Sequence, residues 1–207
     1  MKLDSNAYMV TYTVIMGVVV SLLLTGAGEF ANPRRRANEE AEKLLNVMSA
    51  LGVPFDAKAG AAQLKALFAR EVREVQTPAG VRYLYQPQGV DRPKAVAVPF
   101  EGPGLWGPIK GFLALEPDER TVRGLTVYQQ EETPGLGGEI ASADFCDRFV
   151  GKRIRVDGTP GLWIRPPGTA AASNEVDGIT GATMTCRKVE AMINTAIANI
   201  EPTEASP

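Results

Sequence analysis

The feature that most limits this chain is a run without a single charged side chain, from Ser5 to Gly28. Most of this run is apolar enough to sit in lipid, and about 20 helical residues span the hydrocarbon core of a bilayer. We therefore expect a tail and one transmembrane helix within residues 1–30. The rest of the 207 residues is then available for folding outside the membrane.

A cleaved signal peptide is the alternative interpretation, because Thr25, Gly26 and Ala27 are small residues that suit a cleavage site. The apolar run is longer than the roughly 7–15 residues of a signal-peptide core, which favours a retained anchor. Arg34–Arg36 directly follow the span and by the positive-inside rule alone belong in the cytoplasm. A single span with a short N-terminal tail, however, often leaves that tail inside. The charges leave the orientation open.

Composition excludes several functions. The net charge of −2 argues against a nucleic-acid partner, because phosphate binding needs a clear basic excess. The absence of histidine excludes the usual catalytic triads and removes the commonest metal ligand. Cys146 and Cys186 cannot supply the four thiolates of an iron–sulfur cluster, and we expect them to be unpaired rather than joined in a disulfide. We therefore expect no metal and no catalytic side chain, so any redox chemistry requires an organic cofactor.

Apolar periodicity predicts an α+β fold, with an antiparallel sheet flanked by helices. Helical spacing occurs in three segments, at 38–51, about 61–72 and 188–200. Strand-like runs lie at 81–85, 95–98, 109–115 and 122–128. Asn38 is suited to cap the first helix and Gly52 to end it. We divide the chain into the anchor (1–30), a helical linker region (31–80) and a sheet domain (81–207), and we expect the tail at 201–207 to fray.

The segment from Asp177 to Cys186 is the most informative for function. Its small residues, including Gly181 and Ala182, let a large planar or anionic group approach the backbone. We expect a helix to begin just beyond it, near Arg187, and the N–H groups at a helix start favour a phosphate. The threonines at 180, 183 and 185 place hydroxyls at the same spot. An ordinary helix cap explains the same residues, so chemistry alone leaves both interpretations open.

A family resemblance favours the first interpretation. Thr180-Gly181-Ala182-Thr183, preceded by Asp177-Gly178, resembles the flavinylation motif of the FMN-binding domain family. In that family, a flavin transferase moves FMN from FAD onto the last threonine of the motif as a phosphoester. The resemblance therefore implies a covalent FMN on Thr183, with Thr185 as the fallback acceptor, and makes 81–207 an FMN-binding domain.

A second motif makes the resemblance more specific. Residues 131–140, with the sequence EETPGLGGEI, resemble a loop of the C subunits of Na⁺-translocating NADH:quinone oxidoreductases, as do the segments 101–107 and 111–115 before it. The G subunits of the related Rnf complexes share the domain and the threonine motif, but the Gly-Leu-Trp segment favours the C subunits. The region 151–174 departs from the family by being shorter and rich in proline and glycine.

The two motifs supply candidate contacts to the flavin ring. Trp106 and Leu136 are candidates to pack on the isoalloxazine, since apolar and aromatic side chains line most cofactor sites. Thr133 and the backbone of the thin loop at Gly137 are candidates to bind the polar edge of the ring. Each candidate has an alternative interpretation: Trp106 belongs to the core, and the loop is a simple turn between strands. For Glu132, the sequence leaves two roles open, a surface position or a side chain that orients the loop.

The resemblance implies an electron relay that is not catalytic alone. Electrons are expected from an iron–sulfur centre in a neighbouring subunit and pass to another covalent FMN, while flow from NADH to ubiquinone drives Na⁺ export. The span has no charged residue that marks an ion path, and the chain has no dinucleotide fingerprint. The expected partners are other subunits, the transferase and membrane lipid. The expected location is the bacterial inner membrane, with a periplasmic domain. A stand-alone flavinylated carrier and a non-redox anchored domain are the alternatives.

Overall fold

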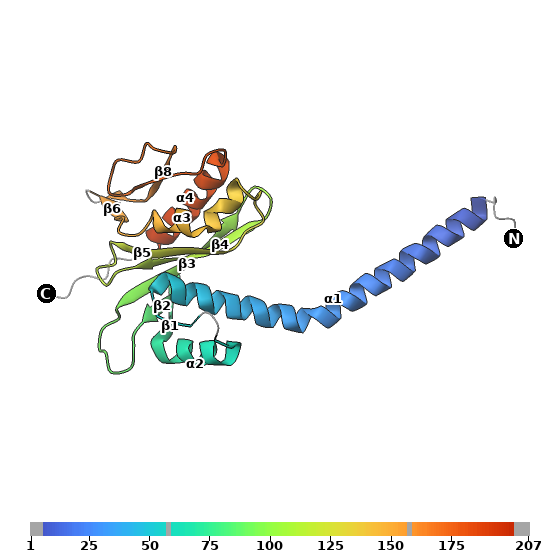
Figure 1. Ribbon diagram of the computed structural model, residues 1–207, viewed down its shortest axis with the longest axis horizontal. Helices are drawn as coiled ribbons and strands as arrows, with labels where there is room; N and C mark the ends of the chain where they lie inside the picture. Colours follow the sequence, from blue (N-terminus) through green and yellow to red (C-terminus); the bar gives the residue numbers. More distant parts are fainter. Residues whose placement is uncertain (1–5, 57–58, 157–158, 201–207) are drawn as a thin grey trace. The chain divides into compact units, whose positions relative to one another are not determined.

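The computed structural model describes residues 6–56, 59–156 and 159–200 (Figure 1). The chain forms two compact units, residues 1–41 and 42–207. The division at 30 and 80 stays a prediction, and residues 42–56 and 59–80 belong to the same unit as the rest of the sheet. The predicted tail at 201–207 lies outside the described residues.

Helix α1 runs without interruption from Asn6 to Leu51. Its part from Asn6 to Asn32 is long and apolar enough to cross a membrane, with a mean hydropathy of 2.1 in its apolar window, a test that signal sequences also pass. The hydroxyls of Thr11 and Thr13 donate to backbone carbonyls four residues earlier, which suits an apolar environment.

The predicted start of a separate helix at Asn38 is therefore wrong, because Asn38 lies inside α1. The predicted end of that helix at Gly52 is confirmed. An exposed ion pair between Arg35 and Glu39 (3.0 Å) supports the helical turn of α1 that these two residues span. At the other end, the N–H groups of Gly52 and Val53 donate to the carbonyls of Ser49 and Met48 and close the last turn.

The second unit is built on one antiparallel sheet whose five strands lie in chain order. These are β1 (Val72–Thr77), β2 (Gly80–Tyr85), β3 (Ala95–Pro103), β4 (Pro108–Leu115) and β5 (Val122–Gln129). The last four confirm the predicted runs. β1 was missed, since its mostly polar side chains, such as Arg73 and Glu74, suit an edge strand and show no clear alternation.

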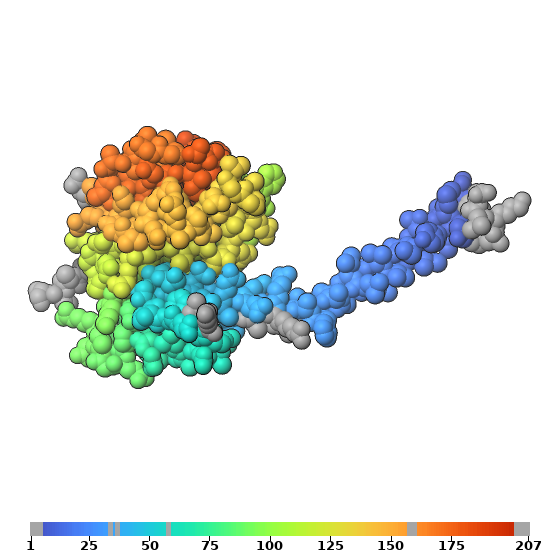
Figure 2. Space-filling model, viewed as in Figure 1, coloured from blue at the N-terminus to red at the C-terminus, as the bar shows by residue number. Residues whose placement is uncertain are grey.

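Helices cover both faces of the sheet, which confirms the predicted α+β architecture. On one face, β3, β4 and β5 share a core with α3 (Ala143–Asp147), α4 (Thr183–Ala198) and the 3-10 helix η1 (Gly137–Ala141). On the other face, the last turns of α1 and helix α2 (Ala61–Glu71) pack around Phe112 and Tyr83. Figure 1 shows α3 and α4 on the opposite side of the sheet from α2. In the space-filling view (Figure 2), the orange and red residues of the C-terminal part and the cyan residues around α2 lie at opposite sides of the second unit.

The region between α3 and α4 contains short strands that periodicity cannot reveal. They are β6 (Arg155–Val156), β7 (Thr159–Pro160), β8 (Trp163–Arg165) and β9 (Glu175–Asp177), with β8 and β9 parallel. Helix α4 begins at Thr183 rather than near Arg187, because the turn before it ends at Ala182. Cys146 and Cys186 are free and buried, as expected. Burial raises the pKa of the Cys146 thiol to about 11.

Candidate functional site

A tight turn precedes the predicted acceptor threonine. The N–H of Ala182 donates to the carbonyl of Ile179 (3.1 Å), and Gly181 occupies the third position with φ +77°. That conformation favours glycine, and a Cβ at this position would also lie 2.9 Å from Cδ2 of Leu136. The turn therefore needs glycine at 181, which brings the backbone of the threonine motif against the second motif.

Thr183 is the first residue of α4, and its side chain is exposed, like that of Thr180. Ala182 occupies the N-cap position, gives no side-chain cap, and points into the core at 4% exposure. Within the described residues, the first turn of this 16-residue helix also carries no acidic side chain. Its N–H groups and positive dipole end thus fit a phosphate on the neighbouring hydroxyl.

Thr185 lies two residues further on and is in a different environment. Its side chain is 1% exposed, and its hydroxyl donates to Oε2 of Glu132 at 2.7 Å. The hydroxyl is already committed to a buried hydrogen bond. The three threonines of the motif are therefore not equivalent, since those at 180 and 183 face solvent and that at 185 faces the interior.

Glu132 joins three segments of the site. It is 5% exposed, and its Oε1 accepts from the N–H groups of Leu105 (2.7 Å) and Trp106 (3.3 Å) at the tip of the β3–β4 hairpin. Its Oε2 receives the hydroxyl of Thr185 on α4. Gly137 lies so close that a Cβ there would be 2.7 Å from Oγ1 of Thr185. Of the two alternatives for Glu132, burial excludes the surface, and the carboxylate ties the hairpin tip to the start of α4.

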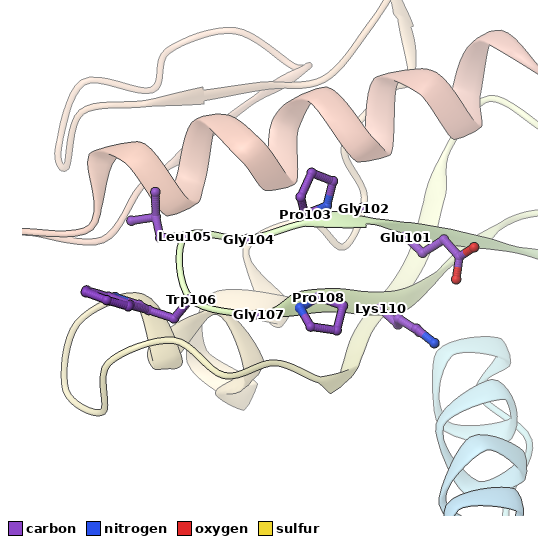
Figure 3. A pocket seen from close by; sticks show the side chains of 9 residues that line it. All are labelled: Glu101, Gly102, Pro103, Gly104, Leu105, Trp106, Gly107, Pro108 and Lys110. Atoms are coloured by element: carbon purple, nitrogen blue, oxygen red, sulfur yellow. The ribbon is translucent and has the colours of Figure 1, made fainter.

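Exposed apolar side chains surround this junction. Leu105 is 47% exposed, Trp106 72%, Leu136 43% and Met184 57%, and we call these four the apolar rim. Trp106 is therefore not a core residue. A shallow hollow of about 700 Å³ runs along the same hairpin, lined by Glu101 to Pro108 and Lys110. Figure 3 shows Leu105 and Trp106 at the hairpin tip.

Two other predicted site residues make local contacts. The carbonyl of Thr133 accepts the N–H groups of Leu136 (3.1 Å) and Gly138 (2.9 Å), which shapes the loop, while its side chain is exposed. The carboxylate of Asp177 accepts the N–H groups of Ala170 and Thr169, and these hydrogen bonds, that of Ala170 first, hold its pKa below the usual value. Asp177 thus anchors the loop before β9, away from the junction at Glu132.

Comparison with known proteins identifies the class of domain that this geometry belongs to. Residues 104–198 match the family described as FMN-binding domain. The match includes the hairpin tip, Glu132, the second motif and all of α4. This match agrees with the resemblance to the FMN-binding domain family that the threonine motif indicated.

Several similar proteins are C subunits of one complex. The C subunit of the Na(+)-translocating NADH-quinone reductase of Haemophilus ducreyi is 28% identical over 226 residues, covering 90% of this chain and 88% of that protein. The corresponding protein of Vibrio anguillarum is 40% identical over 124 residues, covering 59% of this chain and 47% of that protein. The Pasteurella multocida protein is 42% identical over 95 residues, covering 45% and 36%. The chain is a homologue of these C subunits, and its matches of higher identity span less than half of their length.

Solved structures agree in fold. The C subunit of Parabacteroides distasonis superposes with a TM-score of 0.67 at 23% identity, covering 84% of this chain and 96% of that one. The NqrC structure of Shewanella oneidensis also gives a TM-score of 0.67 at 23% identity, covering 76% and 91%. The predicted fold is confirmed.

Replacing Thr185 by valine is expected to lower the free energy of unfolding by about 1–3 kcal/mol, because the buried Oε2 of Glu132 loses its donor. Flavin attachment should slow but still reach completion, because α4 loses one anchor while the predicted acceptor Thr183 stays in place. Urea unfolding and the intact mass of the full chain test both statements, with Thr185→Ser as the control that keeps the hydroxyl. A folded Thr185→Val chain without flavin would move the acceptor to this residue.

Proposed function

We propose that this chain is an electron-relay subunit that carries one FMN, bonded through its phosphate to Thr183, in a membrane complex that oxidises NADH, reduces ubiquinone and exports Na⁺. The homology to C subunits supports the complex. The observation that carries the attachment site is the contrast between two hydroxyls, exposed at Thr183 and buried at Thr185. Only the exposed one is open to a transferase.

The proposed attachment requires no redox change. The hydroxyl oxygen of Thr183 bonds to the phosphorus of the FMN half of FAD, the phosphoanhydride bond breaks, and AMP leaves. One proton is released from the hydroxyl. The uncapped N–H groups at the start of α4 then lie beside the resulting phosphodiester, which offsets its negative charge.

The chain's own residues hold and orient the group. When bound, the isoalloxazine supplies reversible electron transfer. The apolar rim is the surface on which the ring rests, with Leu136 and Trp106 as its main contacts. Thr133 and the backbone at Gly137 face its polar edge. A covalent link keeps the cofactor in place in every redox state.

The proposed setting is the bacterial inner membrane, with a single span and a periplasmic domain. Neighbouring subunits supply and receive electrons, the flavin transferase matures the protein, and lipid surrounds the apolar part of α1. Sodium passes through other subunits, because the stretch from Ser5 to Gly28 has no charged side chain.

Purification of the tagged full chain from its native membrane tests this proposal. We expect a band that fluoresces under ultraviolet light after denaturation, and co-purification with a subunit that oxidises NADH in a Na⁺-stimulated way. A fluorescent chain that purifies alone would instead indicate a stand-alone carrier. A fluorescent chain with a ferredoxin-oxidising partner would indicate an Rnf-type G subunit. A non-fluorescent band would leave a non-redox anchored domain.

Replacing Leu136 by aspartate should keep the tether and lower the reduction potential. A carboxylate beside the ring disfavours added electrons, by on the order of 1 kcal/mol for two charges about 4 Å apart in water. Redox titration and the absorbance spectrum measure the change. Val150→Asp is the matched control, because Val150 is also exposed (52%) but lies after α3, outside the rim. An unchanged spectrum and potential in Leu136→Asp would remove this loop from the flavin site.

A further inference from the structure

Arg148, which follows α3, contacts the segment that leads into the acceptor turn. Its Nη1 donates to two successive backbone carbonyls, those of Asp177 and Gly178, each at 3.0 Å. Asp177 is the last residue of β9, and Gly178 follows it, directly before the turn from Ile179 to Ala182. The arginine and its acceptors are 29 and 30 residues apart in the chain, so local sequence gives no sign of the contact.

The guanidinium is held in place by its own helix. Its Nη2 forms an ion pair with Asp144, one helical turn earlier, and its plane lies over the ring of Phe145 with 5.8 Å to the centroid. Phe145 and Phe149 are fully buried, which fixes this end of α3 in the core. A side chain fixed in this way presents its donors in one direction.

Other hydrogen bonds fix the same segment. The N–H of Gly178 donates to the carbonyl of Arg165 at 2.7 Å, and the carboxylate of Asp177 holds Thr169 and Ala170. Only the four residues of the turn separate Gly178 from Thr183. The position of Asp177 and Gly178 therefore determines the position of the Thr183 hydroxyl.

We propose that Arg148 is a positioning residue for flavin attachment. By binding the carbonyls of Asp177 and Gly178, it holds the turn in the arrangement that presents Thr183 to the transferase. The inference rests on the proposed function, because it concerns the delivery of that same hydroxyl. Its effect falls mainly on the rate of attachment, since the core around Phe145 and Phe149 does not depend on the guanidinium.

The test compares Arg148→Met and Arg148→Lys with the wild-type full chain in detergent. Each apo protein is incubated with FAD and a purified flavin transferase, and the initial rate of FMN addition is followed by intact mass. Hydrogen exchange of amides 179–185 and the melting temperature are recorded in parallel. We expect Arg148→Met to slow attachment about tenfold or more, the scale of losing hydrogen bonds from a charged donor, and to speed exchange in the turn. Arg148→Lys keeps one donor and should be intermediate.

Arg123→Met is the matched control. Arg123 also binds a backbone carbonyl, that of Leu51 (2.7 Å), and a carboxylate, that of Glu116 (3.0 Å), with a similar side-chain exposure of 30% against 33% for Arg148. Its contacts do not include the turn. We expect Arg123→Met to lower the melting temperature without slowing attachment to folded protein.

The outcomes distinguish failure of the proposed function from failure of the inference about Arg148. If the wild-type chain gains no FMN, the proposed function fails. If the wild-type chain gains FMN and Arg148→Met gains it equally fast, only the inference about Arg148 is overturned. The inference about Arg148 would also be overturned if attachment slowed only in proportion to the loss of folded protein and slowed equally in Arg123→Met. That result is expected of an arginine whose role is purely structural.

Discussion

Thr183→Ala is expected to give a protein that folds normally but whose denatured band carries no flavin. The side chain is exposed at the first position of α4, so its loss should change the free energy of unfolding by no more than about 0.5 kcal/mol. Without the hydroxyl, no oxygen is available at this position to bond to phosphorus. Fluorescence of the denatured band and thermal unfolding of the full chain measure the two effects.

Thr180→Ala is the control for Thr183→Ala, because Thr180 is also exposed and lies in the turn directly before Thr183. It should retain the full flavin signal. Thr183→Ser should retain part of it, since serine offers the same type of oxygen. A yellow, fluorescent Thr183→Ala band would show that another residue is the acceptor.

Glu132→Ala is expected to have the largest effect on stability, lowering the free energy of unfolding by about 2–3 kcal/mol. It leaves the N–H of Leu105 and the buried hydroxyl of Thr185 without their acceptor and releases the hairpin tip from α4. For a chain of this size, that corresponds to a fall of roughly 4–12 °C in melting temperature. Attachment of FMN should slow as well, because the first turn of α4 loses its support.

Glu132→Gln separates shape from charge. The amide oxygen can still accept from the backbone of Leu105 and Trp106, and the amide nitrogen can donate to Thr185 if that hydroxyl turns. We expect about half of the destabilisation caused by alanine, or less. Urea unfolding of both variants provides the comparison. Equal stability of wild type and Glu132→Ala would mean that the buried carboxylate does not hold the junction.

The apolar periodicity and turn residues of the sequence predict the strands and helix ends that depend on neighbouring residues. The strands at 95–98 and 109–115 are rich in buried residues of high strand propensity, and the structure places them in β3 and β4. The stop at Gly52 also follows from local chemistry. β1 could not be predicted, because Val72 is the one buried residue of this edge strand and the exposed Arg73 and Glu74 follow it without alternation.

Contacts between distant segments explain what sequence reasoning missed in the site. Glu132 and Thr185 are 53 residues apart, and Glu132 and Leu105 are 27 apart. A glutamate beside a glycine-rich loop gives no sign of such partners, so the role of Glu132 stayed open between surface and support. The contact of Arg148 with Asp177 and Gly178 was missed for the same reason, because these residues are far apart in the sequence. By contrast, the threonine motif was visible because all of its residues lie within one turn and the start of one helix.

The structure also explains why small residues are needed around the acceptor. Gly181 lies against Leu136, and Gly137 lies against Thr185 and Glu132, so the two motifs approach each other through backbone rather than side chains. The resulting junction places an exposed hydroxyl, an uncapped helix start and an apolar rim in one neighbourhood. A phosphate joined to a flat aromatic ring suits that combination.

The intact mass of the full chain, made together with a competent flavin transferase, tests the central claim most directly. The account predicts a mass above that of the polypeptide by one FMN less one water, with the added group on the peptide that contains Thr183. A mature chain with the mass of its amino acids alone would contradict it.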